Sequence, residues 1–103
     1  MVELTLEELE QKLARETQPF AVFFYTPLCG TCKLAERMLA VVLHLMPTLS
    51  LFRVNINHVS DLAQQWQIAS VPALVLLRDG AVAEKHYALR SVDYLYQILK
   101  SLK

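Results

Sequence analysis

The chain has few of the residues that mark the more unusual classes of protein. Its 103 residues include two cysteines, two glycines, four prolines and one tryptophan, which excludes a disulfide-rich scaffold and a glycine- and proline-rich disordered segment. Apolar residues make up 54% of the chain and charged residues 19%, a composition typical of a globular domain. Because a chain of this length fits one hydrophobic core, we expect a single domain over residues 1–103.

An excess of one sign of charge is also missing. Ten lysines and arginines balance ten aspartates and glutamates. No long-range field therefore attracts a phosphate backbone or an anionic membrane surface. We expect no nucleic-acid partner.

The sequence contains no long hydrophobic run. FAVFFY at 20–25 and ALVLL at 73–77 are far shorter than the roughly 20 residues that a membrane helix needs. The amino terminus, MVELTLEELEQKL, carries acidic residues where a secretory signal carries basic ones. We therefore expect no membrane association and a cytoplasmic location. We also expect the protein to be a monomer.

Hydrophobic periodicity predicts that helices and strands alternate along the chain. Helices are expected over about 6–16, 30–46 and 61–66 and from 91 onward, and strands over 20–26, 49–56, 72–77 and 81–87. Asp79-Gly80 predicts a hairpin, so the last two strands should be antiparallel. This order predicts an α/β fold with a central mixed β-sheet flanked by helices on both faces.

Local signals support these elements. Thr5 and Glu8 match a capping box at the start of the first helix, and Ser91 can cap the last one. The second helix should press a wide apolar stripe on the sheet. That stripe comprises Leu34, Ala35, Met38, Leu39, Val41, Val42, Leu45 and Met46.

The two cysteines, Cys29 and Cys32, stand in TPLCGTCK between a strand and a helix. Tetrahedral zinc needs about four ligands, and His44, His58 and His86 lie in different elements, so we expect no metal. A disulfide closing a loop of about four residues contributes only roughly 2 kcal/mol to stability in the chain-entropy treatment. A purely structural bridge is also uncommon in a reducing compartment.

Two buried core thiols are the remaining structural alternative. Pro27 and Gly30 flank the pair, and these residues are typical of an exposed turn rather than of a core. In a strand-to-helix turn, the free N–H groups and the helix dipole would stabilise a thiolate at Cys29. Cys32, one turn later, could then attack a mixed disulfide. The pattern favours a redox couple over the structural and metal alternatives.

FAVFFYTPLCGTCK, followed about forty residues later by IASVPALVLLRDG, resembles the thioredoxin family over essentially the whole chain. The resemblance implies the thioredoxin fold and a thiol–disulfide oxidoreductase that reduces protein disulfides, with Cys29 attacking and Cys32 resolving. It also implies a cis Val71–Pro72 bond beside the cysteines, no cofactor, and electrons from a thioredoxin-reductase-like enzyme or a small thiol. The substrate would dock on Leu28, Gly30, Thr31, Val71, Pro72 and Ala88, with the docking region extending to Leu89.

The chain departs from the family pattern at several positions. Leu28 stands where thioredoxins usually have tryptophan, Thr31 where they have proline, and Ala88 where they have glycine. Phe23 stands at the position of a commonly buried acid, with Arg53 at the neighbouring basic position. The alternative function is a thioredoxin-fold binding or adaptor module with weak or no redox turnover, and Phe23 favours it.

Overall fold

Five strands form one mixed β-sheet in the order β1-β3-β2-β4-β5 in this computed structural model, which describes residues 1–102. The strands are β1 (Val2–Glu3), β2 (Phe20–Tyr25), β3 (Leu51–Asn55), β4 (Ala73–Arg78) and β5 (Ala81–His86). The α-helices are α1 (Leu6–Arg15), α2 (Gly30–Leu45), α3 (Ser60–Gln65) and α4 (Val92–Leu99). Short 3-10 turns, η1 (Ile56–His58) and η2 (Lys100–Leu102), follow β3 and α4.

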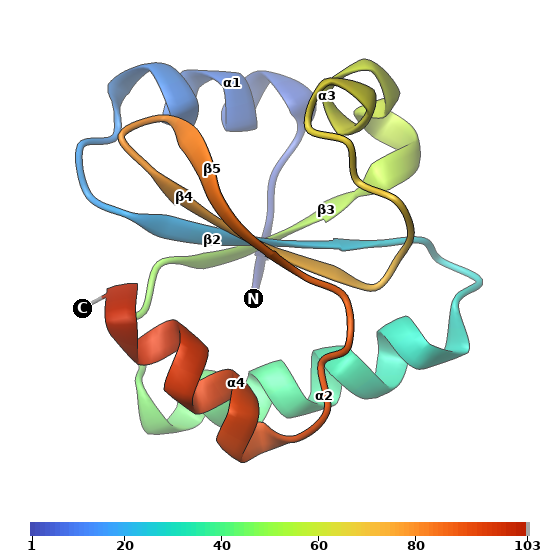
Figure 1. Cartoon of the computed structure of the whole chain (residues 1–103), viewed down its shortest axis with the longest axis vertical. Coiled ribbons are helices and arrows are strands. Elements are labelled where there is room, and N and C mark those ends of the chain that lie inside the picture. The colour runs from blue at the N-terminus through green and yellow to red at the C-terminus, as the bar shows by residue number, and fades with distance from the viewer. Residues whose placement is uncertain (103) are drawn as a thin grey trace.

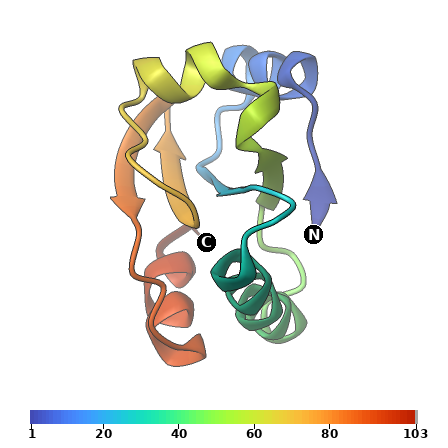
Figure 2. The same ribbon diagram turned by 90° about the vertical axis from the view of Figure 1, so that its right-hand side faces the viewer.

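The helices cover both faces of the sheet. Helices α1 and α3 lie on one face and α2 and α4 on the other (Figure 1). The view at right angles shows the same two helical layers with the sheet between them (Figure 2). The predicted fold class, a central mixed sheet flanked by helices on both faces, is confirmed.

Strand β2 is the centre of the sheet. It runs parallel to β3 and antiparallel to β4, so it is the strand at which the sheet changes from parallel to antiparallel pairing. Residues 20–24 are almost completely excluded from solvent. Their side chains alternate between the two faces, because successive residues of a strand point in opposite directions. Phe23 packs towards α2 and α4, and Phe24 packs towards α1 and α3.

The predicted local signals are present in the structure. Thr5 Oγ1 accepts the N–H of Glu8 at 3.2 Å, and Glu8 Oε1 accepts the N–H of Thr5 at 2.9 Å, which completes the capping box. Asp79 and Gly80 both have positive φ, 54° and 74°, as a tight hairpin turn requires. A Cβ on Gly80 would lie 2.9 Å from the carbonyl oxygen of Leu13. That position therefore needs glycine for both its conformation and its close approach to α1.

One strand was missed, and one expectation about packing was wrong. Strand β1 was not predicted; it consists of two residues that pair with β3, too few to produce a hydrophobic pattern. The apolar stripe of α2 is narrower than expected, because Leu34, Val41 and Leu45 are 56%, 47% and 57% exposed. A helix resting on a sheet buries only one side of its surface, and these three residues lie outside that side.

No helix within residues 1–102 is both long enough and apolar enough to cross a membrane.

Candidate active site

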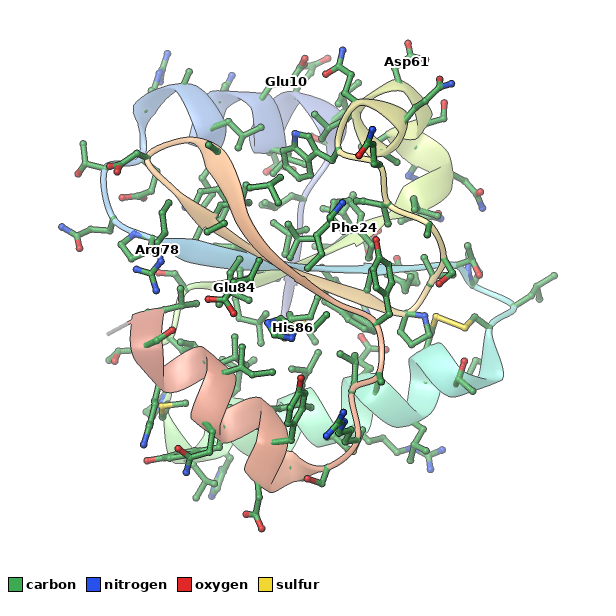
Figure 3. The ribbon with its side chains drawn as sticks, viewed as in Figure 1. Glu10, Phe24, Asp61, Arg78, Glu84 and His86 are labelled. Carbon is green, nitrogen blue, oxygen red and sulfur yellow. A yellow bond between two sulfur atoms is a disulfide. The ribbon has the colours of Figure 1, made fainter. Side chains whose placement is uncertain are left out.

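The register of β2 and β4 brings two distant segments to one edge of the sheet. Phe24, near the end of β2, lies opposite Ala73, the first residue of the antiparallel β4. The chain that leaves β2 towards α2 therefore passes the chain that enters β4. The disulfide lies at the start of α2, beside the loop that leads into β4 (Figure 3). The Val71–Pro72 bond in that loop is cis, as the resemblance implied.

Cys29 occupies the N-cap position of α2. Its Sγ accepts the backbone N–H of Cys32 at 3.1 Å, and its carbonyl accepts the N–H of Lys33 at 3.3 Å. Thr31 Oγ1 lies 3.3 Å from the same sulfur. N–H groups at a helix start have no partner within the helix, and the helix dipole is positive there. A negative charge on Cys29 in the reduced protein is therefore stabilised by its position.

Cys32 differs from Cys29 in its exposure. It is 2% exposed and belongs to the core cluster between the sheet and α2, together with Phe23, Ala35 and Leu39. Cys29 is partly exposed and packs only at the edge of that cluster. One sulfur of the pair can therefore be reached from solvent while the other is sheltered.

Phe23 provides an apolar floor to this part of the core. Its side chain is completely buried in the cluster that holds Cys32, and its ring stacks on Tyr25 with centroids 6.3 Å apart. Among residues 1–102, Asn55 is the only polar residue classed as buried. No carboxylate of the described chain therefore lies in the core around Cys32.

Charged side chains lie beside Phe23, at the edge of the core rather than inside it. Arg53, directly opposite Phe23 on β3, forms ion pairs with Glu36 of α2 and Glu3 of β1. Its Nε lies 3.0 Å from Glu3 Oε1 but makes no hydrogen bond. The hydrogen bond from Arg53 to Glu36 raises the pKa of the guanidinium further above its ordinary range. The basic position identified from sequence is thus neutralised by two carboxylates that were not predicted.

Tyr25 belongs to the same group of side chains. Its hydroxyl donates a hydrogen bond to Glu3 Oε1 at 2.7 Å. Burial, and then the hydrogen bond with Glu3, raise the pKa of Tyr25 to about 12. The phenol therefore stays neutral at physiological pH and remains a hydrogen-bond donor that ties β1 to the end of β2.

A surface groove of about 310 Å³ begins next to the disulfide. It is lined by Thr31, Leu34, Ala35, Met38, Pro72, Tyr87, Leu89 and Arg90. Leu89, at the end of the predicted docking region, lines this groove although its side chain is only 5% exposed and packs in the core.

The other predicted docking residues differ in their exposure and in their packing. Leu28 is 98% exposed, whereas Val71 is partly buried and packs against both core clusters. A Cβ on Gly30 would meet nothing within 4 Å, so space does not require glycine there. Ala88 is exposed and lies outside the groove, although its chain neighbours Tyr87 and Leu89 line it.

Met38, Tyr87 and Arg90 were missed as groove residues. A partial signal existed, because Thr31, Leu34, Ala35 and Met38 follow the i, i+3, i+4, i+7 spacing of one helix face. Nothing in the sequence indicates that Tyr87 and Arg90 approach this face from the segment after β5. Across the part of the chain that the structure describes, no three metal-ligating side chains come together.

The fold and the site define a class of protein. A Cys-x-x-Cys disulfide at the start of a helix, one cysteine accessible and the other buried, beside a cis-proline at the edge of a mixed sheet, is the arrangement of a thiol–disulfide oxidoreductase.

Comparison with known proteins agrees with this class. The Thioredoxin family profile matches residues 1–101. The thioredoxin-like protein YusE of Bacillus subtilis (strain 168) is 39% identical over 100 residues, which cover 97% of this chain and 92% of that protein. The chain therefore belongs to the thioredoxin family.

Solved structures show the same fold. The oxidised form of mitochondrial thioredoxin 3 from Saccharomyces cerevisiae superposes with a TM-score of 0.82 at 22% identity, covering 99% of this chain and 95% of that one. Fasciola hepatica thioredoxin gives a TM-score of 0.83 at 18% identity, with 100% of both chains covered.

Proposed function

We propose that this thiol–disulfide oxidoreductase works as a reductase of protein disulfides, with Cys29 as the attacking thiol and Cys32 as the resolving thiol. The observation that carries the proposal is the asymmetry of the pair. Cys29 Sγ lies at the helix start, partly exposed, and accepts the N–H of Cys32 at 3.1 Å, whereas Cys32 is 2% exposed.

The reaction consists of two exchanges. The Cys29 thiolate attacks one sulfur of the substrate disulfide, that S–S bond breaks, and the departing substrate thiolate takes up a proton. Cys32 then loses its proton and attacks the Cys29 sulfur of the mixed disulfide. The second substrate thiolate leaves and is protonated, and the Cys29–Cys32 disulfide remains, which is the form of the pair in the structure.

Two electrons pass to the substrate in each cycle, and the protein stores them as two thiols. The cycle therefore uses no prosthetic group. A thioredoxin-reductase-like enzyme or a small thiol would restore the dithiol, and a reducing cytoplasm would favour the reductive direction. One copy of the chain holds both cysteines and is expected to act as a monomer.

The substrate's polypeptide is expected to dock around the exposed sulfur. Leu28 precedes Cys29 in the chain, and Gly30 and Thr31 follow it. Val71 and Pro72 come from the loop that enters β4. Ala88 contributes from the segment between β5 and α4.

A turnover assay tests the function. With a protein disulfide as substrate and excess dithiol as electron source, the protein should accelerate disulfide reduction in proportion to its concentration. Protein whose thiols have been alkylated while reduced is the matched control and should be inactive. A thioredoxin-fold adaptor would bind the substrate without this acceleration, so binding without turnover would reject the proposal.

The unequal exposure of the two thiols predicts unequal reactivity. In the reduced protein, limited alkylation should label Cys29 well before Cys32, because only Cys29 combines access to solvent with stabilisation of its thiolate. Peptide mapping by mass spectrometry measures the ratio. Preferential labelling of Cys32 would reverse the assignment of the two roles.

A further inference from the structure

The groove beside the disulfide continues directly from the attacking sulfur. Thr31 Oγ1 lies 3.3 Å from Cys29 Sγ, and Thr31 and Pro72 both line the groove. A substrate polypeptide bonded to Cys29 therefore has the residues next to its own cysteine at the mouth of this groove. Extended chain advances roughly 3.3–3.6 Å per residue, so side chains a few residues from that cysteine can reach along it.

Arg90 is the only charged residue that lines the groove. The other lining residues are apolar, apart from the hydroxyl groups of Thr31 and Tyr87. The Arg90 guanidinium lies over the ring of Tyr94, 4.9 Å from its centroid, and the Tyr94 hydroxyl is 3.2 Å from His86 Nδ1. A cation over an anchored aromatic ring has a restricted orientation. The ring of Tyr94 therefore restricts where the charge of Arg90, a residue that itself lines the groove, can lie.

No carboxylate of the described residues neutralises Arg90. The ion pairs formed within residues 1–102 use the cationic groups of Lys12, Arg53 and His86. Asp93, three residues after Arg90 in the chain, forms no ion pair with it. Arg90 thus keeps an unused capacity for a carboxylate, which a guanidinium can bind in bidentate fashion.

Arg90 is not competing with other charges on the helix face that lines the groove. That face of α2 presents Thr31, Leu34, Ala35 and Met38, whereas the exposed Lys33 and Arg37 lie on other sides of the helix, at 3.6 residues per turn. Glu36 of the same helix is already engaged by Arg53. Glu10 and Asp61 lie on the α1 and α3 layer, across the sheet (Figure 3).

We propose that Arg90 is a specificity residue that selects protein disulfides whose reacting cysteine has an acidic side chain within a few residues. The inference rests on the proposed function, because it concerns which disulfides the protein reduces. The acidic side chain of the substrate lies in the groove, beyond Thr31 and Pro72, and pairs with the Arg90 guanidinium. Apolar residues next to it in the substrate contact Leu34 and Met38.

Peptide disulfides that differ in one residue provide the test. Each peptide carries Glu, Gln or Lys at the second, third or fourth residue on either side of its reacting cysteine, and kcat/KM is measured for each. At the best position, kcat/KM for the Glu peptide should exceed that for the Gln peptide by about two- to fivefold, as expected for a solvent-exposed ion pair, and the Lys peptide should be the slowest. Because salt screens exposed charges, the preference should shrink at about 0.5 M salt.

Variants of Arg90 connect the preference to this side chain. Arg90→Gln should reduce the Glu-to-Gln ratio to about one, and Arg90→Lys should retain part of it, because the charge remains. Arg15→Gln is the matched control: it removes the same charge from α1, on the other face of the sheet, and should keep the wild-type ratio.

The outcomes separate the two proposals. Equal kcat/KM for the Glu and Gln peptides, or an unchanged ratio in Arg90→Gln, would overturn the role of Arg90 while leaving the reductase function in place. If the wild-type protein reduced none of the peptides and no protein disulfide, the proposed function would fail, and the specificity inference with it.

Discussion

Replacing Cys32 with serine is expected to turn the protein from a catalyst into a trap for its substrates. Cys29 keeps its position at the start of α2 and can still attack a disulfide, but no sulfur remains to resolve the mixed disulfide. Turnover should fall by a factor on the order of 10³ or more, the scale of losses when a nucleophile is removed. Substrate should accumulate as an adduct that is seen on non-reducing gels and released by excess dithiol.

The Cys29→Ser variant is the matched control, since it also keeps one cysteine. Its remaining thiol, Cys32, is 2% exposed, so we expect neither turnover nor adducts. Serine is close to cysteine in size, and unchanged circular dichroism spectra would show that both variants fold. Appreciable turnover in Cys29→Ser, or the absence of adducts in Cys32→Ser, would contradict the assigned roles.

Replacing Phe23 with aspartate is expected to change stability and rate in opposite directions. Phe23 is completely buried and stacks on Tyr25. Truncation of a buried phenylalanine typically costs about 3–5 kcal/mol, and an ionisable group placed in the core adds a desolvation penalty. Arg53, opposite position 23 on β3, is already paired with Glu3 and Glu36, so it leaves most of that penalty in place. The free energy of unfolding, measured with denaturant, should therefore fall by a few kcal/mol.

The same substitution should accelerate resolution of the mixed disulfide. Cys32 must lose its proton before it attacks, and no carboxylate of residues 1–102 is buried beside it. A carboxylate at position 23 would lie in the core cluster that contains Cys32 and could accept this proton. Proton transfer to a positioned side chain typically contributes a factor of about 10² or more. We expect overall turnover near neutral pH to rise only about tenfold. Once resolution is faster, the first exchange, in which Cys29 attacks the substrate disulfide, limits the rate.

Phe23→Asn separates the two effects. This variant loses the same aromatic ring and gains a polar side chain close in size to aspartate. The asparagine amide, however, cannot accept the Cys32 proton at neutral pH. It should therefore be destabilised without any gain in turnover. Unchanged turnover in a folded Phe23→Asp variant would mean that water already removes the proton, and equal gains in both variants would point to a loosened core instead.

Much of the fold was predictable because its signals are local. The capping box at Thr5 and Glu8 depends on residues three apart, and the hairpin at Asp79 and Gly80 depends on two adjacent residues that tolerate positive φ. The continuous apolar run of β2 has the composition of a strand buried on both faces, and residues 20–24 are buried in the structure. The redox pair was predictable for the same reason, since Cys29 and Cys32 lie one helical turn apart.

The tertiary structure decided which residues surround that pair. Strand β1 exists only through its pairing with β3, and that register places Glu3 beside Arg53. Leu34 was predicted to lie in the apolar stripe that α2 presses on the sheet, yet it is 56% exposed. Leu89, predicted at the end of the docking region, is 5% exposed and packs in the core.

The sequence by itself determined the four α-helices, strands β2 to β5, their order and the chemistry of the two thiols, because each depends on residues a few positions apart. Strand register and helix packing decided the ion pairs of Arg53 and the groove from Thr31 to Arg90, which join segments up to about 60 residues apart. Such contacts depend on how far each strand slides along its neighbour and on which side of a helix meets the sheet. Those quantities are set by the packing of the whole core, so no short stretch of sequence contains them.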